Sequence, residues 1–199
     1  MKERDLPELA KAAIGDLAAV LEDAKDSAAI LAKAAEIVAA SIEKGGTVYL
    51  CGNGGSAAEA QHFAAEFVGR FLVERPGLPA HALSADTSKL TAIGNDYGFD
   101  LVFARQIKAL GRPGDVLWAL STSGTSKNVI EALKAASEAG LRTIFFCGST
   151  KVDPFIAEMI VPCPAPSTPR VQELHLLFGH IICQLVDEIL FGAGKRAPR

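Results

Sequence analysis

"CGNGGSAAEAQHFAAEFVGR", residues 51–70, joins a glycine-rich turn directly to a helical pattern. The run that ends at Cys51, "TVYLC", is short and apolar, as expected for a buried strand. A strand, a glycine turn and a helix in this order indicate one unit of an α/β domain. His62 and Glu66 lie four residues apart on the helix and therefore share one of its faces. The stretch thus raises two questions: what the turn binds, and whether His62 and Glu66 are chemical or structural residues.

Outward from this unit, short apolar runs alternate with helical patterns. Further strands are expected at "AHALS" (80–84), "DVLWAL" (115–120), "RTIFFC" (142–147) and "EMIVPC" (158–163). Helices are expected at 5–21, 28–42, 100–110, 127–140 and from Thr168 to about Phe191, with "GNDYG" (94–98) as a loop. Strands that are almost continuously apolar and alternate with helices indicate a parallel sheet covered on both faces.

We therefore predict a single three-layer α-β-α domain over residues 1–199, with a mainly parallel sheet of about five strands. Within it, residues 1–45 form N-terminal helices, 46–165 the α/β core, 166–192 a C-terminal helix and 193–199 a solvated tail.

Composition restricts the class of protein. The net charge of -3 gives no electrostatic footprint for nucleic acid. The charged N-terminus does not resemble a signal peptide, and polar residues interrupt the best candidate membrane span, namely His175, His180, Gln184 and Asp187. Four scattered cysteines without a C-x-x-C pair favour a reduced, cytoplasmic protein. We expect neither a nucleic-acid partner nor a membrane.

The glycine turn formally matches a dinucleotide fingerprint, because Gly52, Gly54 and Ala57 fall in the G-x-G-x-x-G/A register. The acidic residue that should meet a ribose would be Glu74, but it lies in the turn "VERPGLP" and not at the end of a second strand. A dinucleotide-dependent oxidoreductase is therefore not supported. Two readings remain for the turn: a plain strand-to-helix connection, or a backbone cradle for an anion.

A second polar loop favours the cradle. "STSGTS", from Ser121 to Ser126, follows another strand and opens another helix, with five hydroxyl side chains around one glycine. Ligands of open α/β sheets bind outside the carboxyl ends of the strands. Two such loops predict a site for one phosphorylated polyol.

Ionisable residues occur in unusually apolar helices. His62 and Glu66 have apolar neighbours, so they are either a satisfied internal pair or ligands or a base at the pocket. The C-terminal helix embeds Gln172, His175 and His180 in an almost wholly apolar surface. Glu173, Asp187 and Glu188 are expected to be solvated or paired surface charges.

Four motifs together resemble the sugar isomerase (SIS) domain family and, within it, the phosphoheptose isomerases. They are "CGNGGSAAEAQHFAAEFVGRF", "LTAIGNDYGFD", "STSGTSKNVIEAL" and "TPRVQELHLLFGHIICQLV", and the likeness runs from about residue 5 to 192. The resemblance implies an aldose–ketose isomerase that converts sedoheptulose 7-phosphate to D-glycero-D-manno-heptose 7-phosphate through an enediol. This is the first step of nucleotide-activated heptose biosynthesis for bacterial surface polysaccharide. It also implies a homotetramer with active sites at subunit interfaces.

The same resemblance implies roles for residues. Glu66 and His180 match the acid/base pair. A zinc site described in some members matches His62, Glu66, Gln172 and His180. Sugar contacts match Asn53, Gly54, Gly55, Ser56, Asn95, Asp96 and Gln172, and the phosphate loop matches Ser121, Thr122, Ser123 and Ser126.

A non-catalytic SIS protein is the main alternative. Relatives of this fold associate with the bacterial replication initiator or sense sugar phosphates, and the initiator-binding kind lacks the glutamate and the second histidine. This chain keeps Glu66 and His180, which favours the enzyme.

Overall fold

Five parallel strands form the centre of the structure, a computed structural model that describes residues 5–148 and 152–192. The strands are β1 (Val48–Cys51), β2 (Ala80–Ala82), β3 (Val116–Ser121), β4 (Arg142–Cys147) and β5 (Met159–Pro162). Their order across the sheet is β2-β1-β3-β4-β5, and every neighbouring pair is parallel. The predicted fold class is confirmed, whereas the predicted tail at 193–199 lies outside the described residues.

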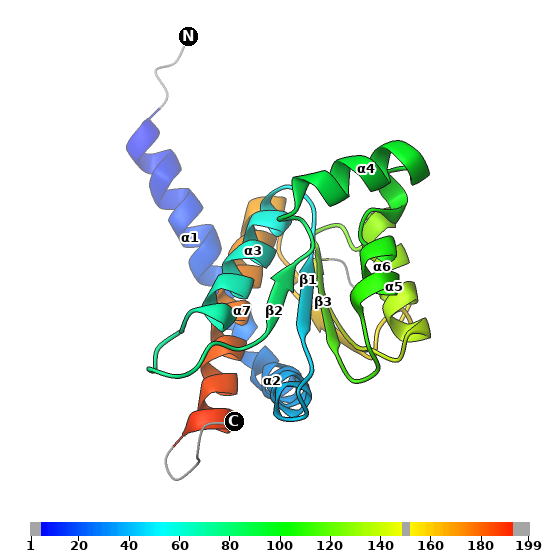
Figure 1. The fold of residues 1–199 in the computed structure, drawn as a ribbon. Helices are drawn as coiled ribbons and strands as arrows, with labels where there is room; N and C mark the ends of the chain where they lie inside the picture. The colour runs from blue at the N-terminus through cyan, green and yellow to red at the C-terminus, as the bar shows by residue number, and fades with distance from the viewer. Residues whose placement is uncertain (1–4, 149–151, 193–199) are drawn as a thin grey trace.

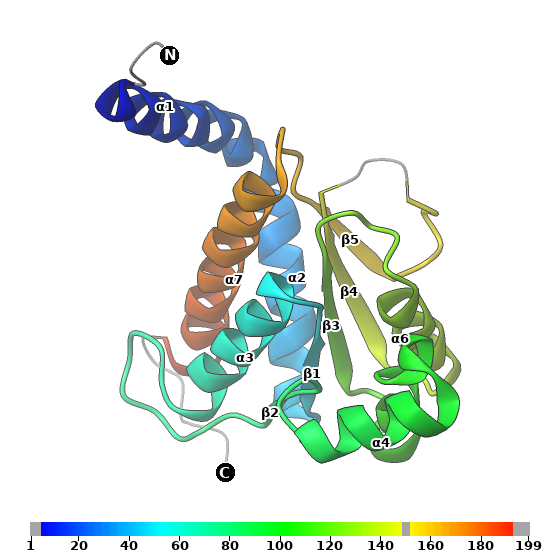
Figure 2. The same cartoon turned by 90° about the horizontal axis from the view of Figure 1, so that it is seen from above.

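The described chain has seven α-helices, and six of them cover the sheet (Figures 1 and 2). On one face lie α2 (Ala28–Glu43), α3 (Gly55–Val68) and α7 (Thr168–Phe191), with α1 (Leu6–Ala24) extending away from them. On the other face lie α4 (Thr87–Tyr97), α5 (Ala104–Leu110) and α6 (Lys127–Glu138). The domain therefore has the predicted three layers.

The strands are apolar at consecutive positions because both of their faces are covered. In β1, Val48 and Leu50 pack with α2, α3 and α7, whereas Tyr49 and Cys51 pack with α5 and α6. All four residues are buried. This is the burial that a central parallel strand requires.

The strand order places the glycine turn after β1 next to the Ser/Thr loop after β3. The chain leaves β1 through α3 on one face and leaves β3 through α6 on the other, although β1 and β3 are direct neighbours. The connections that follow β1 and β3 therefore start side by side at the carboxyl edge of the sheet and lead to its opposite faces. In doubly wound sheets this switch point is where ligands bind.

One predicted boundary is wrong. Residues 94–98 were expected to form a loop, but α4 continues through Asn95 and Asp96 to Tyr97. The side chain of Asp86 caps the start of this helix, and Gly98, with a φ of 86°, ends it. The polar "GND" stretch has the composition of a turn, yet a capped start and a terminal glycine keep it helical. The next predicted helix begins as a 3₁₀ turn at Phe99–Leu101, and α5 proper starts at Ala104.

The last helix, α7, lies at the centre of the apolar layer. It is the one helix in the described part of the chain that is long and apolar enough to cross a membrane, a test that core helices of soluble proteins also pass. Half of its most apolar window is buried against the rest of the domain. Asp187, expected at the surface, is instead buried and forms a 2.5 Å ion pair with the buried Arg75. Burial of both charges explains the difference, because a buried carboxylate needs a partner.

Candidate functional site

The β1–α3 and β3–α6 loops meet at the carboxyl edge of the sheet. Gly54 has a φ of 55° and Gly124 a φ of 72°, in the left-handed region that favours glycine. Neither α3 nor α6 has a side-chain cap on its first N–H groups. Backbone carbonyls accept from the N–H groups of Ser56, Ala57 and Val129, and no side chain in the described part of the chain competes with a ligand for the N-terminus of either helix.

A reciprocal amide pair joins the two loops. Asn53 Nδ2 donates to Asn128 Oδ1 and Asn128 Nδ2 donates to Asn53 Oδ1, each at 2.8 Å. Asn128 is buried in the first turn of α6. It was not predicted from the sequence, where only its position directly after the Ser/Thr loop can be seen. Because both polar atoms of the Asn53 amide bond to Asn128, Asn53 connects the glycine turn to the loop before α6.

The hydroxyl groups of the second loop gather around Ser121. Its Oγ lies 3.0 Å from Ser126 Oγ and 3.4 Å from Ser123 Oγ, and it accepts from the Gly124 N–H at 3.2 Å. Ser121 is buried, while Ser123 is exposed. The loop thus presents hydroxyls in a fixed arrangement at the N-terminus of α6, a chemistry that suits phosphoryl oxygens.

Gln172 of α7 reaches the glycine turn. A Cβ built on Gly55 would lie 2.2 Å from Gln172 Nε2, so the amide packs directly over the glycine backbone. Ser56, the next residue, is buried. Gly55 is therefore needed for close approach, and the structure brings Gln172 to the mouth formed by the two loops.

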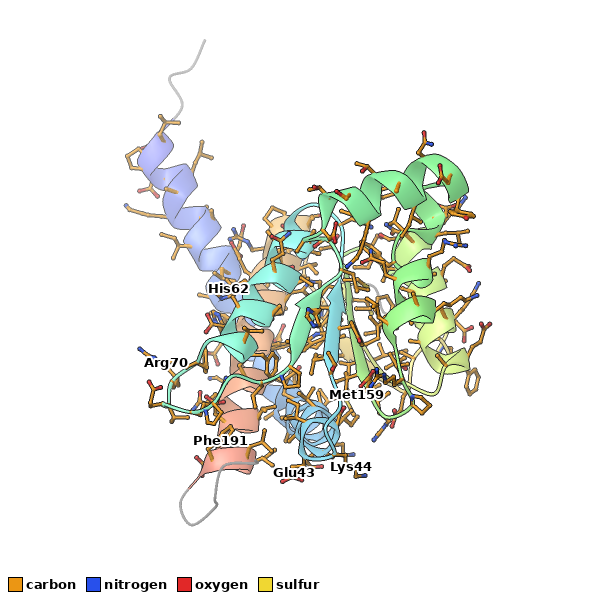
Figure 3. All side chains as sticks on the ribbon, viewed as in Figure 1. Glu43, Lys44, His62, Arg70, Met159 and Phe191 are labelled. Carbon is orange, nitrogen blue, oxygen red and sulfur yellow. The ribbon has the colours of Figure 1, made fainter. Side chains whose placement is uncertain are left out.

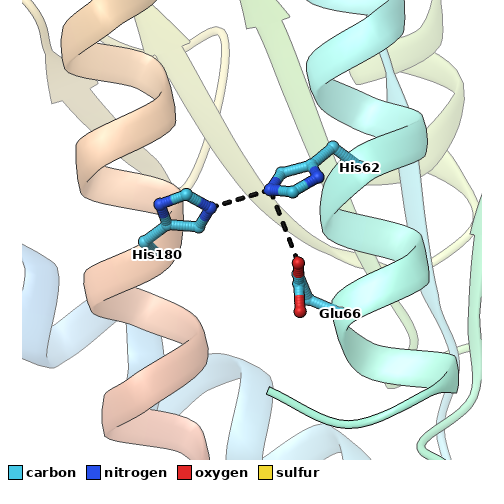
Figure 4. A group of neighbouring side chains, drawn as sticks. All are labelled: His62, Glu66 and His180. Carbon is cyan, nitrogen blue, oxygen red and sulfur yellow. Dashed lines mark hydrogen bonds and ion pairs between the residues drawn. The ribbon is translucent and has the colours of Figure 1, made fainter. Parts of the chain in front are cut away.

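His62, Glu66 and His180 form a cluster between α3 and α7 (Figure 4). His62 Nε2 lies 2.7 Å from His180 Nε2 and 3.5 Å from Glu66 Oε1. One potential ligand atom from each residue lies within 4.8 Å of the others. Of the two readings from the sequence, an internal pair and an accessible group, the second fits better, because the His62 side chain is 42% exposed and Glu66 22%.

The electrostatics of the cluster favour a neutral histidine. Burial lowers the pKa of His180, and His62 lowers it further, while Glu66 acts in the opposite direction. A hydrogen bond between the two rings also requires one nitrogen to accept, which a protonated ring cannot do. A neutral imidazole can ligate a metal or accept a proton.

Two imidazoles and one carboxylate are a donor set that zinc uses in catalytic sites. The described residues of this cluster therefore fit a zinc ion. Gln172 lies eight residues before His180 on α7, about 12 Å along the helix axis. Within one chain, Gln172 is thus at the loop mouth and not at the cluster.

Asn95 and Asp96 lie apart from the loops. Both are exposed near the end of α4, where Asn95 Nδ2 donates to Asp96 Oδ1 at 2.8 Å. Asp96 lines a pocket between α4 and α5 together with Lys89, Tyr97 and Arg105. Among the residues described, neither forms a hydrogen bond with the glycine turn or the Ser/Thr loop, so their role as sugar contacts stays a prediction.

A second buried contact links α3 and α7. His175 Nδ1 lies 3.4 Å from Glu59 Oε2, with both residues buried. A Cβ on Gly179 would lie 2.1 Å from the Phe63 ring, so this glycine also allows close approach of the helices. The two helices run in the same direction, because contacts made further along α3 fall further along α7. The contacting pairs are 55 with 172, 59 with 175, 62 with 180 and 63 with 179. Glu59 was not singled out by the sequence.

Comparison with known proteins agrees with this geometry. Residues 14–148 match the SIS domain. The chain is 53% identical over 167 residues to a phosphoheptose isomerase of Desulfovibrio desulfuricans, covering 83% of this chain and 80% of the relative. It is 51% identical to that of Rhodospirillum rubrum, covering 83% and 88%.

Solved structures give the same result. The phosphoheptose isomerase of Neisseria gonorrhoeae matches with a TM-score of 0.84 and 42% identity over 92% of this chain and 99% of that one. The enzyme of Francisella tularensis matches with a TM-score of 0.86 and 32% identity over 94% and 100%. The sugar isomerase domain of a Sphaerobacter thermophilus transcription factor shares the fold alone, at 17% identity and a TM-score of 0.59. The chain therefore belongs to the SIS domain family and, within it, to the phosphoheptose isomerases.

Proposed function

We propose that this chain isomerises sedoheptulose 7-phosphate to D-glycero-D-manno-heptose 7-phosphate through an enediol. The observation that carries the proposal is the cluster of Glu66, His62 and His180 in a chain of this family. The reaction would supply the first intermediate of nucleotide-activated heptose biosynthesis.

The chemistry assigns a proton-transfer role to two residues. A ketose becomes an aldose when a base removes a proton from C1 and returns it to C2, while a proton moves between the two oxygens. Glu66 acts as the base at carbon, and His180 acts on the oxygens. Burial and His62 lower the pKa of His180 and so favour its neutral form, in which one ring nitrogen can donate a proton to one oxygen while the other accepts a proton. Each such step contributes roughly 10²–10⁴-fold to the rate.

The other end of the substrate is held by the loops. Ser121, Thr122, Ser123 and Ser126 bind the phosphate at the N-terminus of α6, supported by the hydroxyl cluster around Ser121. The polyol is contacted by Asn53, Gly54, Gly55, Ser56, Asn95, Asp96 and Gln172. The packing of Gln172 over Gly55 supports part of this set.

We further propose one zinc ion per subunit, held by His62, Glu66 and His180, with Gln172 as a fourth ligand. When bound, zinc would polarise the substrate carbonyl. Because Gln172 lies about 12 Å along α7 from His180, the fourth ligand would come from a neighbouring chain. Zinc ligation and proton transfer use the same atoms of Glu66 and His180, so metal analysis is needed to separate the two roles.

Metal removal tests this proposal. Chelator-treated protein is expected to lose turnover and to regain it on addition of stoichiometric Zn²⁺, with His62→Ala as the variant that no longer retains the ion. Wild-type protein purified without chelator should contain zinc. Turnover that is independent of added zinc, in protein without bound metal, would remove zinc from the mechanism.

A homotetramer with shared active sites is also proposed. Glu66 lies eleven residues after Gly55 on α3, about 16 Å along the helix, so the glycine turn and the base of one chain are well separated. A site completed by a neighbouring chain would shorten that separation. Leu6, Leu9 and Ile14 of α1 are exposed apolar residues, and they support contacts between chains. All four cysteines are buried and no disulfide joins them, which supports a cytoplasmic, reduced protein.

The deciding assay is incubation of the purified protein with sedoheptulose 7-phosphate, followed by detection of the aldose product. Formation of a heptose aldose at a rate that depends on protein concentration is the expected result. Binding of the sugar phosphate without conversion would leave the non-catalytic alternative, a sugar-phosphate receptor.

A further inference from the structure

We propose that Arg75 and Asp187 are positioning residues that fix the catalytic base Glu66 relative to His180. This inference rests on the proposed role of Glu66. Neither residue belongs to the glycine turn, to the Ser/Thr loop or to the His62–Glu66–His180 cluster. Arg75 lies in the loop after α3, and Asp187 lies near the end of α7.

Arg75 binds the backbone of the base itself. Its Nη2 donates to the Glu66 carbonyl at 2.9 Å, and its Nη1 donates to the Phe67 carbonyl at 2.9 Å and to the Pro76 carbonyl at 3.1 Å. Glu66 and Phe67 are in the last turn of α3, where carbonyl groups lack partners within the helix. A planar guanidinium with several fixed N–H groups can satisfy such carbonyls together, and a lysine cannot.

Asp187 connects this helix end to α7. Its Oδ1 accepts from Arg75 Nε at 2.5 Å, and the side chains of Arg75 and Asp187 are 1% and 4% exposed. Asp187 follows His180 by seven residues, about 10 Å along the same face of α7. The Arg75 guanidinium also lies 5.8 Å from the centre of the Phe191 ring. Figure 3 labels Phe191 at the end of α7. One buried side chain therefore contacts both helices that carry the acid/base pair.

Cys183 lies close to the same charges. Burial raises the pKa of this thiol, the negative charges of Glu66 and Asp187 raise it further, and Arg75 has the opposite effect. Cys183 is 1% exposed in the core between the helices. Glu66 and the Arg75–Asp187 pair are thus within electrostatic range of one buried atom.

The consequence is specific to the chemical step. A displacement of about 1 Å in a catalytic group can reduce a rate about 10²-fold. The glycine turn lies at the other end of α3, and the Asn53–Asn128 bond links it to α6 and its phosphate loop. Loss of the pair should therefore displace Glu66 and lower kcat with little change in KM.

Arg75→Lys and Asp187→Asn test the proposal in the full-length enzyme. Both are expected to lower kcat at least about 10-fold, with KM within about 3-fold of wild type. Asp115→Asn is the matched control. Asp115 is also buried and accepts from two backbone N–H groups, of Thr47 and Arg112, but it lies before the amino end of β3, away from the site.

The control separates positioning from general stability. If Asp115→Asn lowers Tm as much as Arg75→Lys but keeps kcat, positioning is supported; an equal loss of kcat in Asp115→Asn overturns it. The double variant Arg75→Met, Asp187→Leu removes both charges and is expected to recover Tm without recovering kcat. Recovery of both, or wild-type kcat in Arg75→Lys, overturns the proposal as well.

Glu66→Gln distinguishes this proposal from the proposed function. If Glu66→Gln is inactive but the Arg75 and Asp187 variants match wild type, only the positioning role fails. If Glu66→Gln retains turnover, Glu66 is not the base and the proposed mechanism fails first.

Discussion

At the scale of single residues, the acid/base assignment depends on two side chains from distant parts of the sequence. Glu66 and His180 both contact or face His62, which lies between them in the cluster. His62 and Glu66 are partly exposed, and burial together with His62 lowers the pKa of His180, which favours its neutral form. These properties agree with proton transfer to and from a bound sugar.

Substitution of either residue should remove turnover without unfolding the protein. Glu66→Gln and His180→Gln keep similar size but lose the proton-transfer group, so we expect at least a roughly 10²–10⁴-fold loss of kcat. The aldose assay and circular dichroism provide the measurements. Glu74→Gln, at an exposed loop position, is the control and should keep activity. Substantial turnover in Glu66→Gln or His180→Gln would exclude that residue from the mechanism.

Tyr49 gives a prediction of pH dependence. Burial raises its pKa, Asp115 raises it further, and Arg112 acts in the opposite direction. Because the unfolded chain releases this proton first as the pH rises, the stabilising contribution is complete below about pH 10 and is lost above it. In Tyr97→Phe, where Tyr49 is the remaining tyrosine, tyrosinate absorbance should appear at higher pH than for free tyrosine.

The matched variant is Tyr49→Phe, which leaves the exposed Tyr97. In Tyr49→Phe the free energy of unfolding should fall less steeply above about pH 10 than in Tyr97→Phe. Ionisation of Tyr49 at the pH of free tyrosine would contradict the prediction.

At the scale of elements, two contacts organise the site: the packing of α3 against α7 and the link between the two ligand loops. The helix pair depends on glycines at both ends of the contact, since side chains at Gly55 or Gly179 would collide with Gln172 or Phe63. The loop link depends on the paired amides of Asn53 and Asn128.

Removal of the loop link should affect binding more than chemistry. Asn128→Ala leaves the partly buried Asn53 amide without its partner, which should lower the free energy of unfolding by roughly 1–3 kcal/mol. It should also raise KM for the sugar phosphate more than it lowers kcat. Denaturant unfolding and steady-state kinetics measure both effects. Lys134→Ala, an exposed position of the same helix, is the control; unchanged KM and stability in Asn128→Ala would contradict the role of the link.

At the scale of the whole molecule, α1 stands apart from the domain core. None of its residues is buried, and Leu6, Leu9 and Ile14 are 68%, 56% and 71% exposed. Two contacts connect α1 to the rest of the domain. Arg170 Nη1 donates to the Ala13 carbonyl at 2.5 Å, and Val20 and Ala24, at the end of α1, pack against the core. An exposed apolar stripe of this kind marks an interaction surface.

Deletion of residues 1–25 should lower the oligomeric state and the activity together. The reason is that the shared sites of the proposed tetramer would lose their second chain if the assembly dissociated. Light scattering and the aldose assay provide the measurements, and Lys11→Ala, on the polar side of α1, serves as the control. A tetramer that persists after the deletion would exclude α1 from the assembly contacts.

Local patterns predicted the strands and most of the helices, and the family resemblance grouped His62 and Glu66 with His180. The predictions that failed or were missing involve partners distant in the chain. Arg75 pairs with a residue 112 positions away, and Asn53 with one 75 positions away. Nothing in their immediate sequence shows that the charge of Asp187 is buried or that the amide of Asn128 faces a loop. The error at residues 94–98 has a different cause, because a cap at Asp86 outweighed the local turn composition.

The sequence alone determined the α/β class, the parallel sheet, both ligand loops and the pairing of His62 with Glu66 on one face, because each follows from the periodicity or composition of a short segment. The tertiary structure decided the strand order, which brings the two loops to one switch point, and the packing of α3 on α7, which brings His180 to Glu66. It also decided that Arg75 and Asp187 are buried together. Strand order and helix packing depend on contacts between segments far apart in the chain, and the free energy of those contacts is not encoded in any one segment.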